Sequence, residues 1–108
     1  MDKFVGEYNK LVRDGIPGIA RAEGLRPVTR TLNDDEYLTR LYEKNFEEAK
    51  EVQESGGDIG ELGDQLEVIR AIAKAKGYRW ADVVDAADVK RQQRGGFDEK
   101  TYLEEITE

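Results

Sequence analysis

The sequence predicts an all-α fold, and three observations support this. Apolar residues recur at the three- and four-residue spacing of a helix over most of the chain. Capping residues and glycines stand at the ends of these periodic stretches. The segment from Pro27 to Leu32 has the proline and β-branched residues of an extended chain, but a single strand cannot form a sheet. We therefore expect an antiparallel helical bundle, preceded by a short irregular or extended N-terminal segment.

The first helix is expected from about Ile16 to Ala22. Asp14 is a candidate cap, and Pro17 falls in the first turn, where its missing N–H costs nothing. Gly24 lies just past the end, where a left-handed residue commonly stops a helix. Residues 1–7 give no clear pattern.

The longest helix is expected to begin at Asn33 or Asp34, either of which can cap it, and to end near Ser55. Asp35 and Glu36 in its first turn suit the positive end of the helix dipole. Its apolar stripe consists of Tyr37, Leu38, Leu41, Tyr42, Ala49 and Val52.

A third helix should follow the candidate cap Asp58 and stop at Gly77. Its apolar arc is broad, so we expect it to be the most buried helix. The arc consists of Leu62, Leu66, Val68, Ile69, Ile72 and Ala73. A fourth helix is expected over Trp80–Arg94, ended by Gly95 and Gly96.

The core must be thin, because apolar and charged residues each make up 38% of the chain. A thin core spread over several helices suggests that two chains pack together, so we expect dimerisation to complete the bundle. The length of 108 residues suits one domain, residues 1–108. The last segment, Phe97–Glu108, offers Tyr102, Leu103 and Ile106 as packing points.

Several classes of protein are disfavoured by composition. No apolar run is long enough to cross a membrane, so we expect no membrane partner. The chain has no cysteine, which excludes disulfides and thiolate metal sites and favours a cytoplasmic setting. It has no histidine, the commonest transition-metal ligand. The net charge of −7 makes a nucleic-acid polymer a poor partner.

The acidic charge is concentrated around two motifs, Glu47-Glu48-x-x-Glu51 and Glu61-x-x-Asp64, on either side of Gly56-Gly57. If the glycines form a tight turn, the flanking helices are antiparallel and the carboxylates of Glu48, Glu51, Glu61 and Asp64 meet at similar heights. Glu48, Glu61 and Asp64 also fall on the apolar sides of their helices, where an unpaired carboxylate is costly.

Oxygen ligands without nitrogen or sulfur select hard cations such as Mg²⁺ or Mn²⁺. The alternative is that these acids are solvated helix faces or partners of lysines, which is the better account of any single Glu-x-x-Glu motif. Two motifs placed symmetrically about a turn favour the metal. Such a centre suits hydrolysis of a phosphoanhydride, with Glu47 as our candidate for orienting or deprotonating water.

Two basic pairs are candidates for binding phosphate oxygens. Lys90 and Arg94 share a helix face, and the equally good alternative is that they complement the C-terminal end of their own helix. Lys10 and Arg13 carry the same ambiguity.

Three blocks of the chain together resemble a known family. The acidic motifs resemble the EExxE…ExxD pattern of the MazG-like, all-α nucleoside triphosphate pyrophosphohydrolases. The run Asn9–Asp14 followed by Ile16-Pro17 resembles the opening of small members related to phosphoribosyl-ATP pyrophosphohydrolase. The run from Lys90 to Phe97 resembles their KxxxRGGF ending. The nine residues between Glu51 and Glu61 form a shorter spacer than in larger relatives.

The resemblance implies a homodimer or a dimer of dimers that cleaves a nucleotide substrate to NMP and pyrophosphate with Mg²⁺. It implies Glu48, Glu51, Glu61 and Asp64 as metal ligands, with clearance of non-standard nucleotides as one role. Two alternatives stay open: phosphoribosyl-ATP cleavage in histidine biosynthesis, and an acidic helical dimerisation module without catalysis.

Overall fold

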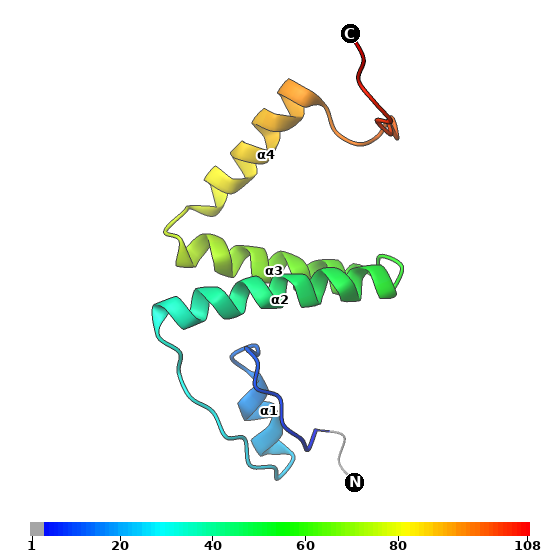
Figure 1. The fold of residues 1–108 in the computed structure, drawn as a ribbon. Coiled ribbons are helices and arrows are strands. Elements are labelled where there is room, and N and C mark those ends of the chain that lie inside the picture. The colour runs from blue at the N-terminus through cyan, green and yellow to red at the C-terminus, as the bar shows by residue number, and fades with distance from the viewer. Residues whose placement is uncertain (1–3) are drawn as a thin grey trace.

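A computed structural model describes residues 4–108. In that range the chain forms four helices and no strand: α1 (Ile16–Ala22), α2 (Asp34–Glu54), α3 (Ile59–Ala75) and α4 (Trp80–Arg94) (Figure 1). The predicted all-α class is confirmed over these residues. The segment from Pro27 to Leu32, interpreted as extended, has no strand partner there.

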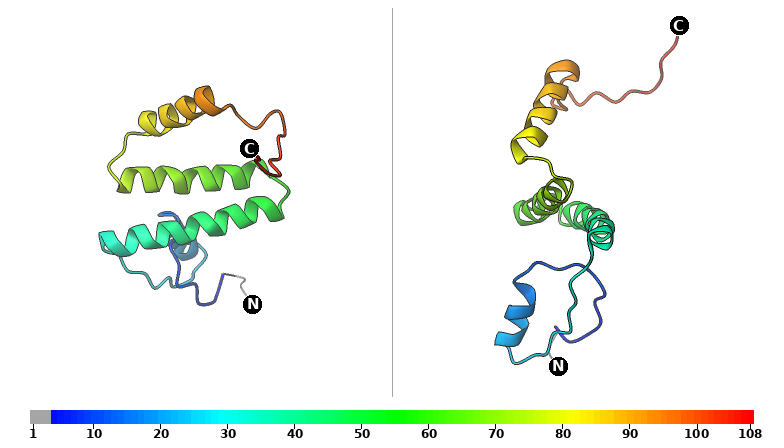
Figure 2. Two further views of the ribbon diagram at one scale, coloured as in Figure 1. Left: turned by 45° about the horizontal axis from the view of Figure 1, so that its top comes forward. Right: turned by 90° about the vertical axis from the view of Figure 1, so that its left-hand side faces the viewer.

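The centre of the fold is an antiparallel hairpin of α2 and α3, which lie side by side in every view (Figures 1 and 2). Gly56 and Gly57 have φ of 70° and 84°, the left-handed conformation that side chains with a Cβ rarely adopt. The N–H of Gly57 donates to the carbonyl of Val52 at 2.9 Å, which closes the end of α2. The carboxylate of Asp58 then accepts from the N–H of Gly60 at 2.9 Å and caps α3, as predicted.

The other helix starts agree with the sequence except at α1. The side chain of Asn33 accepts from the N–H of Glu36 at 2.9 Å and caps α2. The prediction that Asp14 caps α1 is wrong. Gly15 occupies the cap position, which has no side-chain hydrogen bond, because the helix begins one residue later than an Asp14 cap requires.

The core is as thin as the composition predicts. Leu41, Val68 and Ala73 are the buried apolar residues in the described range, and all three belong to α2 or α3. The prediction that α3 is the most buried helix does not hold for the single chain, because α2 and α3 each bury two residues, and Leu62 and Leu66 stay 50% and 40% exposed. A two-helix hairpin covers only one side of each helix.

The outer helices add little to this core. α1 lies on the α2 side of the hairpin but packs on no other helix, and α4 contacts α3 alone (Figure 1). Neither helix buries a residue. The predicted packing of Tyr102, Leu103 and Ile106 is wrong within one chain, since all three side chains are exposed.

The open arrangement leaves much more surface than a compact protein of this size. The accessible surface is 9790 Å², whereas a folded monomer of 12.3 kDa exposes about 6,100 Å². The radius of gyration is 18.5 Å, against about 13 Å for a compact domain of this length. Among the described residues, no helix has the length and apolar character needed to span a membrane.

The cap at the start of α3 gives a first testable prediction. Asp58→Ala removes the acceptor for two backbone N–H groups and should lower the free energy of unfolding by roughly 1 kcal/mol. In thermal unfolding followed by circular dichroism, this corresponds to a Tm lower by about 4–8 °C. Asp58→Asn is the control, because asparagine caps equally well without the charge. An equal loss in both variants would show that charge, and not capping, is responsible.

Candidate metal centre

The hairpin brings three of the predicted carboxylates together. Glu48 and Glu51 lie one turn apart on α2, and Glu61 lies in the first turn of α3. One carboxylate oxygen from each falls within 4.8 Å of the others. Because the Gly56–Gly57 turn makes the helices antiparallel, residues equally far from the turn meet, which is the geometry that the motif spacing predicts.

Glu48 is the least exposed member of this group. Its residue surface is only 6% exposed, and its Oε2 atom is buried without a hydrogen-bond partner. Burial raises the pKa of Glu48 above its ordinary value, and the neighbouring charge of Glu51 raises it further. The ammonium of Lys44, 3.5 Å from Glu48 Oε1, offsets part of this effect.

Glu61, on α3, also has a buried carboxylate oxygen without a hydrogen-bond partner. This atom is Oε2, and the residue as a whole is partly buried. Loss of hydration raises the pKa of Glu61, and the charges of Glu51, Asp64 and Asp58 add to the rise. Two buried carboxylate oxygens without donors are expensive to maintain.

A divalent cation would satisfy these oxygens. Carboxylate ligands alone, with no nitrogen or sulfur among them, suit Mg²⁺ or Mn²⁺. The unpaired Oε2 atoms of Glu48 and Glu61 are the observation that makes the residues fit such an ion. The alternative interpretation agrees with the structure in part: a solvated helix face does not describe Glu48, which is buried, but Lys44 lies 3.5 Å from its Oε1, as expected for an acid paired with a lysine.

Asp64, predicted as the fourth ligand, lies outside the group of three. Its Oδ1 accepts from the guanidinium of Arg13 at 2.7 Å. Asp64 still lies near enough to Glu61 for its charge to raise the pKa of that residue. The structure therefore places Asp64 at the edge of the centre, paired with a cation of the chain itself.

Glu47, the candidate for activating water, points to two lysines. Its Oε1 accepts from Lys10 at 3.0 Å and lies 3.5 Å from the ammonium of Lys44. Burial alone would raise the pKa of Glu47, but the Lys10 hydrogen bond and the charge of Lys44 bring the pKa below its ordinary value. The pKa of Glu47 is thus lowered, whereas those of Glu48 and Glu61 are raised.

Lys10 and Arg13, predicted as phosphate ligands, border the acidic centre. They come from the irregular segment before α1 and pair with acids 37 and 51 residues away in the sequence. Among the hydrogen bonds of residues 4–108, these two ion pairs join the N-terminal segment to the hairpin.

Lys90 and Arg94, the other predicted phosphate ligands, do not reach the centre in the single chain. Both are exposed on α4, which contacts only α3. Arg94 stands in the last turn of α4, so the alternative interpretation, in which the basic residues complement the helix dipole, agrees with this position.

The sequence analysis did not single out two polar residues of α2 that precede Glu48. Lys44 lies three and four residues before Glu47 and Glu48, a spacing that predicts helical ion pairs. Asn45 has a buried Oδ1 with no hydrogen-bond partner, one turn before Glu48. Only its position on the stripe shared with Leu41 and Glu48 could have indicated this.

Comparisons with known proteins give little beyond this geometry. No family model and no solved structure matches the chain. An uncharacterized protein of Mycolicibacterium smegmatis is 52% identical over 44 residues, which is 41% of this chain and 45% of that protein. The chain therefore matches less than half the length of this relative.

The raised and lowered pKa values predict an unusual pH dependence of stability. The folded state binds protons at Glu48 and Glu61 more tightly than the unfolded state, so their contribution is complete below the ordinary value of 4.5 and is lost as pH rises. Glu36 and Glu47 have lowered pKa values, so their contribution is lost only below 4.5. With metal removed by a chelator, Tm should rise from pH 7 to about pH 4.5 and fall below it.

Glu48→Gln should reduce that rise, because the amide cannot ionise and the contribution of Glu48 is lost. Glu54→Gln, on the same helix but exposed, is the matched control and should retain it. If the metal-free protein loses stability steadily as the pH falls from 7, the raised pKa values assigned to Glu48 and Glu61 are contradicted.

Proposed function

We propose that this protein is a Mg²⁺-dependent nucleoside triphosphate pyrophosphohydrolase, which releases NMP and pyrophosphate. The observation that supports this most is the meeting of Glu48, Glu51 and Glu61 oxygens within 4.8 Å, with buried oxygens on two of these residues lacking any donor. The sequence resemblance to the MazG-like family supplies the reaction class.

In this proposal Glu48, Glu51 and Glu61 hold the metal. Bound Mg²⁺ would neutralise phosphate charge and lower the pKa of a coordinated water. Asp64 stands beside these ligands and can join them by exchanging Arg13 for the cation, because their ion pair is partly exposed. An exposed ion pair contributes at most about 1 kcal/mol, so breaking it to bind the cation has a small cost in free energy.

Glu47 is the residue that we assign to proton transfer. It is adjacent to Glu48 in the sequence but lies outside the group of three, so its carboxylate is not needed as a ligand. Lys10 and Lys44 keep it ionised, and an ionised carboxylate is the form that accepts a proton from water.

Lys10 and Arg13 are the cations best placed for substrate phosphates. Each is partly exposed and borders the acidic centre through an ion pair. A guanidinium binds two phosphate oxygens with its planar fork, and an ammonium acts as a point charge. We expect Lys90 and Arg94 to reach a phosphate only in an assembly that brings α4 to the centre.

Self-association is part of the proposal, as a homodimer or a dimer of dimers. The support is the excess exposed surface of the single chain, together with the half-exposed apolar residues Leu62 and Leu66 on the central hairpin. The same surface favours a second candidate function, an acidic helical dimerisation module without catalysis. Dependence of activity on the carboxylates separates the two.

The central prediction concerns Mg²⁺ and Glu48. Mg²⁺ at 100 times its Kd should raise the free energy of unfolding by about 2.7 kcal/mol, seen as a higher Tm. A panel of NTPs, dNTPs, damaged nucleotides and phosphoribosyl-ATP should show pyrophosphate release from at least one compound. Glu48→Gln should lose both the Mg²⁺ effect on Tm and the turnover.

Glu54→Gln is the matched control. It removes one negative charge from α2, as Glu48→Gln does, but leaves the centre intact, so it should behave as wild type. Release of orthophosphate alone would change the reaction class. Stabilisation by Mg²⁺ without turnover of any nucleotide in the panel would favour the dimerisation module.

A second prediction separates the two roles of Arg13. Arg13→Ala removes a positive charge from the edge of the centre and frees Asp64, so the affinity for Mg²⁺ should rise by up to about fivefold, the range of an exposed ion pair. The same change should lower kcat/KM for the nucleotide, because a phosphate donor is lost. Isothermal titration with Mg²⁺ and steady-state kinetics measure the two effects. Arg26→Ala, an exposed arginine of the α1–α2 connection, should change neither.

A further inference from the structure

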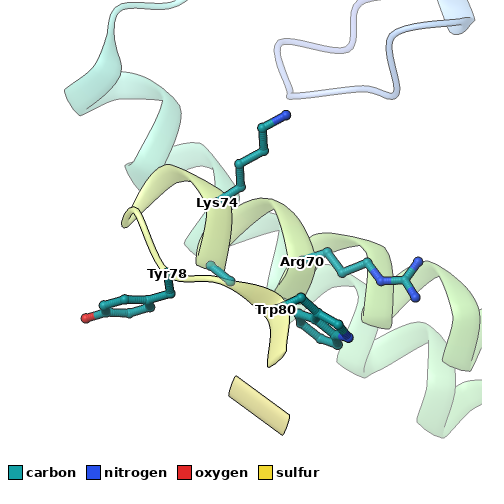
Figure 3. Close-up of a pocket in the computed structure, with 5 residues that line it drawn as sticks. Arg70, Lys74, Tyr78 and Trp80 are labelled. Carbon is teal, nitrogen blue, oxygen red and sulfur yellow. The ribbon is translucent and has the colours of Figure 1, made fainter. Parts of the chain in front are cut away.

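An open recess lies at the opposite end of α3 from the acidic centre. It is an open hollow of about 390 Å³ at the α3–α4 connection, lined by Arg70, Ala73, Lys74, Tyr78 and Trp80. Ala73 is buried, and Trp80 is partly buried. Figure 3 shows Arg70 and Trp80 on one side of the connection and Tyr78 on the other, whereas the Lys74 side chain extends from the helix away from the two rings.

The hollow combines aromatic surface with positive charge. The guanidinium carbon of Arg70 lies 5.5 Å from the centre of the Trp80 ring, a cation–π contact that keeps the charge beside the ring. Neither Arg70 nor Lys74 has an ion pair with an acid in the part of the chain that the structure describes. These two cations lack an acidic partner there even though the net charge of the chain is −7. The hollow therefore suits a ligand that is both apolar and acidic.

The segment Phe97–Glu108 has that character. It contains five acidic residues and one lysine. Its four large apolar side chains are 69–97% exposed: Phe97, Tyr102, Leu103 and Ile106. The segment extends away from the helices in the right-hand view of Figure 2.

We infer that the segment Phe97–Glu108 of a second copy of this chain docks at the Arg70–Trp80 hollow. Within one chain the hollow is at the start of α4 and the segment follows its end, about 22 Å away along the 15-residue helix. In a dimer with twofold symmetry each segment can reach the other chain's hollow, and both contacts form at once. The acids of the segment meet Arg70 and Lys74, and its apolar side chains cover Trp80 and Tyr78.

This contact would also account for the poor packing of α4. The helix and the segment after it contribute no buried residue to their own chain. Residues 80–108 then form an arm whose apolar groups are buried only in the assembly. The inference rests on the proposed self-association and not on nucleotide hydrolysis, so the pyrophosphate assay is an independent measurement.

Charge reversal with mixing tests the contact. Lys74→Glu in one preparation and Glu104→Lys with Glu105→Lys in another should each raise the Kd of self-association at least tenfold, measured by analytical ultracentrifugation. In a mixture of the two, each hollow meets a segment of opposite charge, so the mixed dimer should recover affinity close to wild type. Circular dichroism checks that both variants stay helical.

Unchanged association in either variant, weakening in both without recovery on mixing, or a wild-type chain that stays monomeric at every concentration would overturn the inference. The first two outcomes leave the proposed catalytic centre untouched, and they are distinguishable from its failure because pyrophosphate release is measured on the same samples.

Crosslinking separates docking between chains from docking within one chain. The sequence has no cysteine, so each introduced thiol is unique. Lys76→Cys, beside the hollow, and Thr101→Cys, in the segment, replace residues that the proposed contact does not use. A bis-maleimide should join the two variants when they are mixed, and Lys50→Cys on α2 should not substitute for Lys76→Cys. A chain that carries both thiols and is crosslinked only internally at low concentration would show that the segment folds back onto its own hollow.

Discussion

The placement of an acidic side chain inside a thin helical interface is the constraint on which the rest of this structure depends. Glu48 lies between α2 and α3 beside the few apolar residues that form the core, and Glu51 and Glu61 converge on it. A hairpin with so little apolar burial gains limited free energy from packing. Part of that gain is offset by the repulsion between these carboxylates and by the buried oxygens of Glu48 and Glu61, which lack a hydrogen-bond donor. A ligand that binds these carboxylates would stabilise the arrangement. Ligand binding therefore explains the acids better than a contribution to the stability of the hairpin does.

The surrounding basic residues fit the same account. Lys44 and Lys10 neutralise Glu47, and Arg13 neutralises Asp64, so the acids at the edge are paired while Glu48 and Glu61 each keep one oxygen without a donor. Pairing at the edge lowers the net negative charge of the site. The unpaired oxygens of Glu48 and Glu61 are the atoms that would contact a cation in the proposed function.

The sequence predicted local features well and long-range ones poorly. The α1 and α4 boundaries, the Asp58 cap and the Gly56–Gly57 turn follow from residues adjacent in the chain, and the meeting of Glu51 with Glu61 follows from that turn. The pairing of Arg13 with Asp64 was not predictable, because it depends on how an irregular segment crosses the hairpin. The exposure of Leu62 was missed for a related reason. Periodicity shows which helix face is apolar, but not whether one chain supplies enough neighbours to cover it.

The short connection between α2 and α3 has a consequence for how this chain can vary. The length and conformation of this connection set the rotation of α3 relative to α2, and within α3 each residue then advances by about 100°. One residue inserted between Gly57 and Asp58 leaves both helices and their caps intact yet gives the chain a different path into α3. Unless the loop absorbs the extra residue without rotation, Glu61 turns away from Glu51. Homologous chains should therefore change length here only in steps that restore the phase, while substitutions on the outer faces accumulate freely.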